Sequence, residues 1–74
     1  MDEQNRLFGT VTYLNDRQFG FIKYGKEKSC FFHSKNLKGF RFNDLTIGTQ
    51  VEFEETETER GLHAINILIV EDVS

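Results

Sequence analysis

Two aromatic segments determine the fold: Arg17-Gln18-Phe19-Gly20-Phe21-Ile22-Lys23-Tyr24 and Cys30-Phe31-Phe32-His33. These segments favour β-strands over residues 19–24 and 30–33, because aromatic and β-branched side chains suit a pleated, half-buried surface. The segment that separates them, Gly25-Lys26-Glu27-Lys28-Ser29, is polar and begins with a glycine suited to a turn. The two segments therefore predict a β-hairpin.

Three other segments have strand character. Residues 7–14 mix apolar side chains with threonines, residues 50–54 alternate polar and apolar, and residues 62–70 are mainly apolar. Residues 54–61 continue the fourth strand into a turn at Arg60-Gly61. Residues 34–48 lack strand character and predict a long connection with at most one helical turn.

Five short strands in a chain of 74 residues cannot cover both faces of an open sheet. Closing the sheet buries one face and removes the free edges. The sequence therefore predicts an all-β, five-stranded antiparallel barrel. We expect a single domain over residues 1–74, with its core at about residues 7–70.

The composition is that of a small globular protein, with 38% hydrophobic and 28% charged residues. The single cysteine, Cys30, allows no disulfide, and no Cys/His spacing indicates a metal site, so we expect neither metal nor cofactor. The N-terminal sequence has no signal-peptide pattern, and no apolar run is long enough to span a bilayer. We expect a cytoplasmic protein without a membrane partner.

The charges are distributed unevenly along the chain. The net charge of -3 by itself argues against a simple electrostatic binder of nucleic acid. However, residues 17–41 contain seven basic residues and one acidic residue, whereas residues 51–74 contain one basic residue and seven acidic ones. Nine of the ten aromatic residues lie within residues 8–42. The aromatic part of the chain is therefore also the basic part.

Strand alternation places the hairpin aromatics on two faces. Phe19 and Phe21 share one face of their strand. On the next strand Phe31 and His33 share one face, and Cys30 and Phe32 share the opposite, inward face. Enough other apolar residues exist to fill a small barrel without them: Val11, Leu14, Ile22, Val51, Phe53, Ile65 and Ile67. Outward rings beside lysines fit single-stranded nucleic acid, whose bases stack on aromatic side chains. The alternative is that these phenylalanines are simply core residues.

The two aromatic segments resemble a pair of nucleic-acid-binding motifs. The first fits the RNP1 octamer except at Gln18 and Ile22. The second resembles the RNP2 segment of the cold-shock domain, and the resemblance to the bacterial cold-shock protein family extends over almost all of residues 7–70. The other segments that carry it are Gly9-Thr10-Val11-Thr12-Tyr13-Leu14-Asn15, Phe42 with Asp44, Leu45 and Gly48, Val51-Glu52-Phe53, Arg60-Gly61, and Ala64-Ile65-Asn66-Ile67.

This resemblance implies an OB-fold barrel that binds single-stranded RNA or DNA with low sequence specificity. The implied role is that of an RNA chaperone, an antiterminator or a cold-shock-type regulator of gene expression. The residues carried over as the binding surface are Tyr13, Arg17, Phe19, Phe21, Phe31, His33, Phe42 and Arg60.

Several positions depart from the family pattern. Tyr13 stands in place of tryptophan, Gln18 in place of glycine and Ser34 in place of an aromatic residue, while Thr12 replaces a lysine. The loop of residues 15–17 is also one residue shorter than usual. The loss of one stacking ring predicts an affinity lower by about 1–3 kcal/mol.

Two other classes of protein fit the sequence less well. An RNA-recognition motif requires two amphipathic helices and an RNP2 strand that precedes RNP1, and neither is present. An enzyme is not indicated, because the chain lacks a nucleophile elbow, an HExxH motif and a phosphate-binding glycine loop, and we expect no small-molecule substrate. Cys30 is interpreted as a small core residue and His63 as a solvated strand residue without a role.

The sequence is also compatible with one alternative function. The same OB-type barrel could serve protein–protein interaction, with weak or lost nucleic-acid binding and the acidic residues 52–59 as part of the surface. The sequence does not distinguish RNA from DNA, because stacking does not read the 2′-hydroxyl. We expect a monomer, although a barrel with a long connection also permits strand exchange between two copies.

Overall fold

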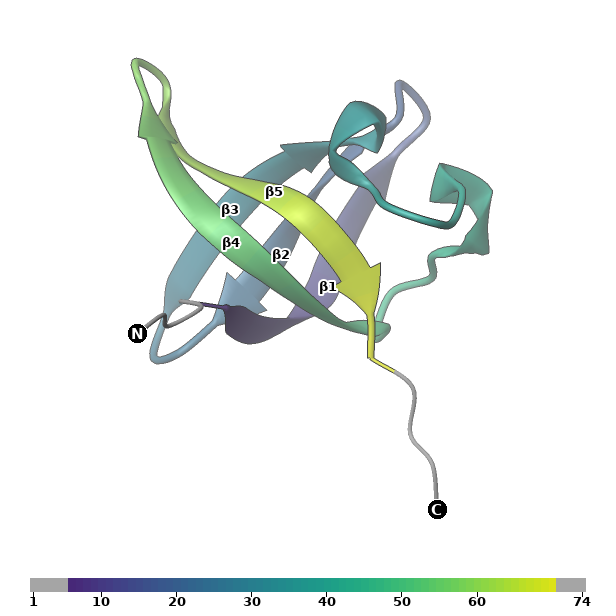
Figure 1. Ribbon diagram of the computed structural model, residues 1–74, viewed down its shortest axis with the longest axis horizontal. Helices are drawn as coiled ribbons and strands as arrows, with labels where there is room; N and C mark the ends of the chain where they lie inside the picture. The colour runs from purple at the N-terminus through teal and green to yellow at the C-terminus, as the bar shows by residue number, and fades with distance from the viewer. Residues whose placement is uncertain (1–5, 71–74) are drawn as a thin grey trace.

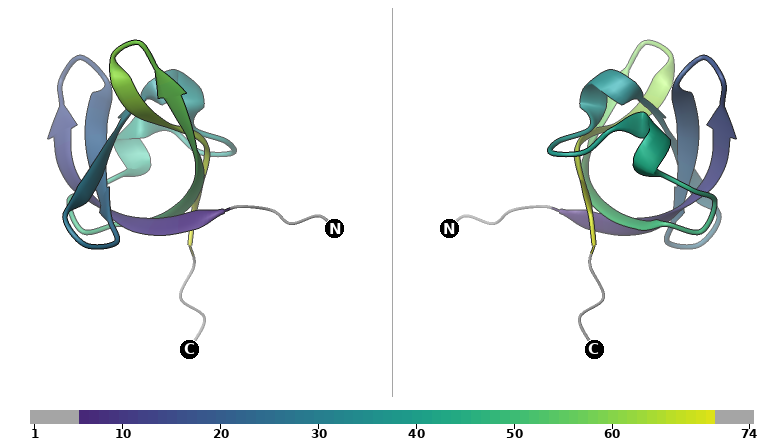
Figure 2. Two further views of the ribbon diagram at one scale, coloured as in Figure 1. Left: turned by 90° about the vertical axis from the view of Figure 1, so that its left-hand side faces the viewer. Right: turned by 90° about the vertical axis from the view of Figure 1, so that its right-hand side faces the viewer.

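The computed structural model describes residues 6–70, which form a closed five-stranded barrel in the order β1-β2-β3-β5-β4 (Figures 1 and 2). This confirms the predicted barrel, and β2 has the predicted bounds. The strands are β1 (Leu7–Asn15), β2 (Phe19–Tyr24), β3 (Lys28–His33), β4 (Gln50–Thr58) and β5 (Gly61–Ile69).

The barrel is not antiparallel throughout. Four of the pairings are antiparallel: β1 with β2, β1 with β4, β2 with β3, and β4 with β5. β3 and β5 close the barrel in parallel, with Phe31 opposite His63. A closed ring with an odd number of strands cannot alternate in direction all the way round, so one parallel pairing is required. The fully antiparallel expectation is corrected at this one junction.

The core consists mostly of the residues that strand alternation predicts. Ten apolar side chains are buried: Val11, Ile22, Tyr24, Cys30, Phe32, Leu45, Val51, Phe53, Ala64 and Ile67. Cys30 and Phe32 face inward as predicted. Leu14 packs against this cluster from a half-buried position.

A bulge in β5 explains why Ile65 lies outside the core. Glu52 pairs with Leu68 but Glu54 pairs with Ile65, so β5 contains one extra residue. Asn66 lies at this irregularity with a φ of 51°, in the left-handed region. The alternation therefore changes phase, and Ala64 takes the inward position that was predicted for Ile65.

A second bulge, in β1, separates two residues that strict alternation would place together. Val11 pairs with Ile22, and Tyr13 pairs with Phe21, so Thr12 is the extra residue. Val11 is buried, whereas Tyr13 is 43% exposed. The bulge thus lets β1 supply a core residue and an outward ring within three positions.

The long connection between β3 and β4 contains two short 3-10 turns, η1 (Ser34–Asn36) and η2 (Phe42–Asp44), rather than at most one. It folds over one end of the barrel (Figure 2), where Leu45 is buried and Leu37, Phe40 and Phe42 pack against the core. Both turns are only three residues long, which is why no helical period marks them in the sequence. Within residues 6–70 no helix is long and apolar enough to cross a membrane.

Arg6 holds the start of β1 against the bulge of β5. Its guanidinium donates to the carboxylates of Glu52 and Glu54 at 2.9 and 3.2 Å and to the Asn66 carbonyl at 2.8 Å. The side chain is 16% exposed. The charge-assisted bond to Asn66 ties Arg6 to the backbone of β5 at the bulge.

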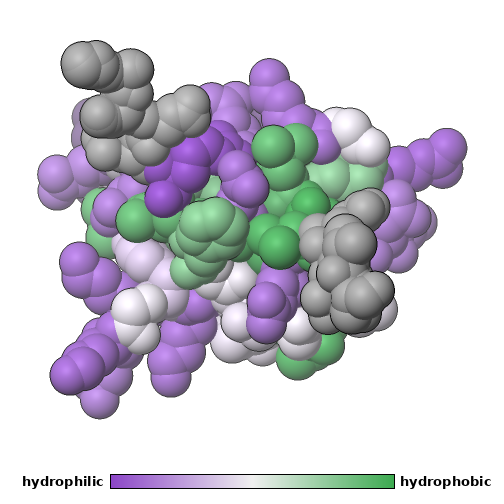
Figure 3. Space-filling view, turned by 60° about the horizontal axis from the view of Figure 1, so that its bottom comes forward, coloured by the Kyte–Doolittle hydropathy of each residue, from purple (hydrophilic) through white to green (hydrophobic). Residues whose placement is uncertain are grey.

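Part of the outer surface of the barrel, near β1 and β5, is apolar. Figure 3 brings the bottom of Figure 1 forward and shows an apolar area at the centre of that face, bordered by hydrophilic residues. Phe8 is 63% exposed, and Leu68 is 42% exposed. They lie on β1 and β5, on either side of Glu52 in the strand register. Phe8 is therefore an exposed ring that belongs to another part of the surface than Phe19, Phe21 and Phe31.

Candidate nucleic-acid interface

Four aromatic rings form a continuous surface on the outer face of β1, β2 and β3. The ring centroids of Tyr13 lie 6.3 Å from Phe19 and 5.8 Å from Phe21, and those of Phe31 lie 5.5 Å from Phe19 and 5.9 Å from Phe21. Tyr13 and Phe21 are exposed, whereas Phe19 and Phe31 are half-buried. We call these four residues the aromatic platform.

The backbone beneath the platform requires a residue without a side chain. Gly20 lies between Phe19 and Phe21 and is buried. A Cβ atom at this position would collide with the carbonyl oxygen of Tyr13 and with the ring of Phe32. The F-G-F pattern therefore has a physical reason, since glycine lets β1 and the core approach the strand that carries the two rings.

His63 extends the platform, although the sequence assigned it no role. Its ring meets the Phe31 ring edge-on at a centroid distance of 4.8 Å. Arg60 and His63 line a pocket of about 310 Å³ together with Phe21 and Phe31. The structure thus brings Arg60 and His63 together beside Phe21 and Phe31. Only the parallel pairing of β3 with β5 reveals His63, and no local sequence pattern signals that pairing.

Arg17 and His33 lie at one end of the platform. His33 pairs with Phe19 across β2 and β3, and its Nδ1 accepts a hydrogen bond from the backbone of Lys35 at 3.2 Å. It therefore caps η1 as well as bordering the rings. Arg17 is exposed in the turn after β1. Asn15, in the same region, donates to the Tyr13 hydroxyl at 2.8 Å and helps to orient that ring.

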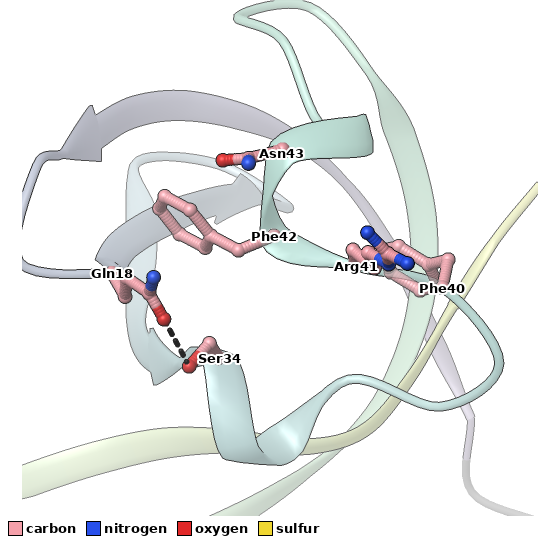
Figure 4. Close-up of a pocket in the computed structure, with 6 residues that line it drawn as sticks. All are labelled: Gln18, Ser34, Phe40, Arg41, Phe42 and Asn43. Carbon is pink, nitrogen blue, oxygen red and sulfur yellow. Dashed lines mark hydrogen bonds between the residues drawn. The ribbon is translucent and has the colours of Figure 1, made fainter.

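Phe42 lies beyond this end of the platform in a second pocket of about 310 Å³ (Figure 4). Its half-buried ring is 6.3 Å from the ring of the core residue Phe32 and forms no ring pair with the platform among the described residues. The residues that line this pocket are Gln18, Ser34, Phe40, Arg41, Phe42 and Asn43.

Two buried titratable groups serve the core rather than the surface. Burial, and then the 2.9 Å hydrogen bond that its hydroxyl donates to Glu55, raise the pKa of Tyr24 above its usual range. Burial likewise raises the pKa of the fully buried Cys30 thiol. A thiol in this state is a poor nucleophile. Among residues 6–70, no group of three or more His, Cys, Asp and Glu side chains could hold a metal ion.

Residues 7–70 match the protein-family model of the 'Cold-shock' DNA-binding domain. The chain belongs to the cold-shock domain family. Nucleic-acid binding is therefore its function at the level of the family, in agreement with the prediction from the two aromatic segments.

Known cold-shock proteins align with most of the chain. Cold shock protein CapB of Pseudomonas syringae pv. tomato and the major cold shock protein CspA of Pseudomonas aeruginosa are each 34% identical over 67 residues, which cover 89% of this chain and 97% of the relative. Cold shock protein CspA of Staphylococcus saprophyticus is 36% identical over 61 residues, 81% of this chain and 92% of the relative. The solved structure of drosophila Unr CSD456 superposes with a TM-score of 0.75 at 28% identity, over 92% of this chain and 28% of that one.

Two departures of this cold-shock domain from the family pattern meet in the structure. Gln18, which stands in place of glycine, has a φ of 70°, a conformation that glycine adopts without strain. Ser34, which stands in place of an aromatic residue, donates from its hydroxyl to Gln18 Oε1 at 3.1 Å. The two polar side chains are therefore in direct contact, at the border between the platform and the Phe42 pocket.

Proposed function

We propose that this cold-shock domain binds single-stranded RNA or DNA across the aromatic platform with low sequence specificity. The observation that carries the proposal is the continuity of the four rings, whose neighbouring centroids lie 5.5 to 6.3 Å apart. Each base that stacks on such a ring contributes about 1–3 kcal/mol, and every base presents a π-face. The binding residues in this proposal are Tyr13, Arg17, Phe19, Phe21, Phe31, His33, Phe42 and Arg60, together with His63.

The charges support stacking as the main source of affinity. Lys23 follows Phe21 on the outward side of β2, and its exposed ammonium is available to a phosphate. The chain as a whole carries a net charge of -3, which weakens long-range attraction of an anionic strand. We therefore propose moderate affinity with a weak dependence on salt.

The corresponding biological role is that of an RNA chaperone, an antiterminator or a related regulator of gene expression in the cytoplasm. Such a role requires reversible, non-enzymatic binding to exposed single strands and no small-molecule substrate. We propose that the protein acts as a single monomeric domain, because a closed barrel offers no free strand edge to a second copy.

Tyrosine fluorescence provides a direct test, since the chain contains two tyrosines and no tryptophan. Tyr13 lies in the platform, whereas Tyr24 is buried in the barrel, so a stacked base should quench Tyr13 alone. We expect saturable quenching at low salt with short RNA and DNA strands of matched sequence.

The control variants separate the platform from other exposed rings. Phe19→Ala should weaken binding, whereas Phe8→Ala, which alters an exposed ring elsewhere, should not. Saturable binding that Phe19→Ala leaves unchanged would argue against the platform. The absence of saturable binding would refute the proposed function and favour a barrel adapted to protein–protein interaction.

A further inference from the structure

The Phe42 pocket adjoins the platform and differs from it in chemistry. Gln18 precedes Phe19 of the platform, and Ser34 follows His33, which pairs with Phe19. A strand stacked on the platform therefore reaches this pocket at the start of β2 and the end of β3. The pocket has room for a base, at about 310 Å³, and it combines the rings of Phe40 and Phe42 with polar side chains.

Two hydrogen bonds fix the polar side of the pocket. The Ser34 amide donates to the Gln18 carbonyl at 2.9 Å, and the Ser34 hydroxyl donates to Gln18 Oε1 at 3.1 Å. The side-chain oxygen of Gln18 is thus occupied by a donor. Its amide nitrogen carries two N–H groups and, within residues 6–70, donates to no other group. The accessible end of Gln18 is therefore a hydrogen-bond donor.

The other side of the pocket offers a stacking surface. Figure 4 shows the Phe42 ring directed toward Gln18, with the Asn43 amide on the same side of the connection, while Phe40 and Arg41 lie on the other side. The Phe42 ring rests against Phe32 of the core, which holds it in place. A base stacked on Phe42 would present its edge to the Gln18 amide.

We propose that this pocket takes one base of the bound strand and reads the exocyclic group on its edge through Gln18, which Ser34 orients. A donor from Gln18 matches the carbonyl oxygen of uracil and thymine at position 4 and of guanine at position 6. Cytosine and adenine carry an amino group at the same place, which would oppose one donor to another. The pocket therefore prefers a keto base at one position, whereas the platform accepts any base. This inference rests on the proposed function and adds selectivity at a single position.

The test compares the affinities of strands that differ at one position by bases of similar size, thymine against cytosine and guanine against adenine. Short thymine strands in which cytosine replaces one thymine at a time are titrated by tyrosine fluorescence, and guanine is compared with adenine at the position so identified. We expect one position at which cytosine weakens binding by about five- to tenfold, near the lower end of hydrogen-bond discrimination because one donor group is involved. Guanine should bind better than adenine there, and the other positions should show little difference.

Two variants connect this selectivity to the pocket. Gln18→Gly suits the positive φ of that residue and removes the donor, and Ser34→Ala removes the hydroxyl that orients it. Both should bring the affinities for the thymine strand and the cytosine-containing strand together, and so abolish the preference for a keto base. Phe8→Ala should retain the preference, and Phe31→Ala should weaken all strands by a common factor.

The outcomes of the inference and of the proposed function are distinguishable. If the protein binds tightly but no position distinguishes thymine from cytosine, Gln18 does not read a base. The same conclusion follows if the preference for a keto base persists in Gln18→Gly. Neither result would affect the platform. The absence of binding to every strand would instead refute the proposed function.

Discussion

Phe31→Ala is the most informative substitution for the proposed interface. Phe31 lies at the centre of the cluster, with its ring 5.5 Å from Phe19, 5.9 Å from Phe21 and 4.8 Å from His63. Its loss removes one stacking surface and the lateral support of three others. We therefore expect Phe31→Ala to reduce the binding free energy by about 2–3 kcal/mol, the upper part of the range for one stacked base. This loss corresponds to a Kd about 30- to 150-fold higher.

The neighbouring residue Phe32 provides the matched control for folding. Phe31 is half-buried on the outer face, whereas Phe32 is fully buried on the inner face of the same strand. Phe31→Ala should lower the free energy of unfolding by about 1–2 kcal/mol, because only part of the ring is removed from water. Phe32→Ala should lower it by about 3–5 kcal/mol, because the whole ring is buried.

Urea denaturation followed by circular dichroism measures the two losses of stability, and fluorescence titration of the folded Phe31→Ala protein measures its affinity. Phe8→Ala completes the set, since its ring is 63% exposed and lies outside the platform. A folded Phe31→Ala protein with the affinity of the original chain would refute the platform. A stability loss equal to that of Phe32→Ala would refute the assignment of the two faces.

Four other predictions follow from particular contacts and charges. Arg6→Ala should lower the free energy of unfolding by about 1–3 kcal/mol, because it removes charged hydrogen bonds, including one to the Asn66 carbonyl. Urea denaturation measures this loss of stability, and an unchanged midpoint would contradict the prediction. The contribution of Tyr24 to stability should be retained below about pH 10, the usual pKa of tyrosine, and be lost as the pH rises further, because the folded state favours the neutral form of Tyr24. Thermal melts across this range should show a shallower alkaline decline for Tyr24→Phe, and identical declines would contradict the assignment. Glu27→Gly should raise stability by up to about 1 kcal/mol, since Glu27 has a φ of 64° and the relief of left-handed strain exceeds the added entropy of the unfolded chain; a lower melting temperature would contradict this. Finally, the logarithm of the affinity should fall with the logarithm of the salt concentration with a slope of about -1.5 to -2, as for two to three phosphate contacts; a slope of about -4 or steeper would mean that lysines rather than rings dominate.

Strand alternation predicted the central hairpin well. β2 has the predicted bounds, and the assignment of Phe31 to the outer face and Phe32 to the inner face is confirmed by their burial. This success has a physical cause, since the inner face of the hairpin is fully buried and a slip of one residue would expose Cys30 and Phe32 to water.

Alternation failed where a strand gains a residue. The bulges at Thr12 and near Asn66 change which side chains face inward, and they respond to the curvature of the closed barrel rather than to a local sequence signal. Ile65 was therefore assigned to the core in place of Ala64. His63 was overlooked for a related reason, because its neighbour Phe31 lies on a strand that is distant in the sequence.

The parallel junction between β3 and β5 gives the barrel a seam that coincides with the candidate interface. The register joins these strands through Phe31 and His63, and the chain then runs beside β5 through the bridge between Leu37 and Ile67. A strand of nucleic acid that lies over both rings would span this seam from outside. Bound nucleic acid should therefore slow amide hydrogen exchange along β3 and β5 more than along β1 and β4. In that case the ligand stabilises the pairing of β3 with β5 and thereby the closure of the barrel.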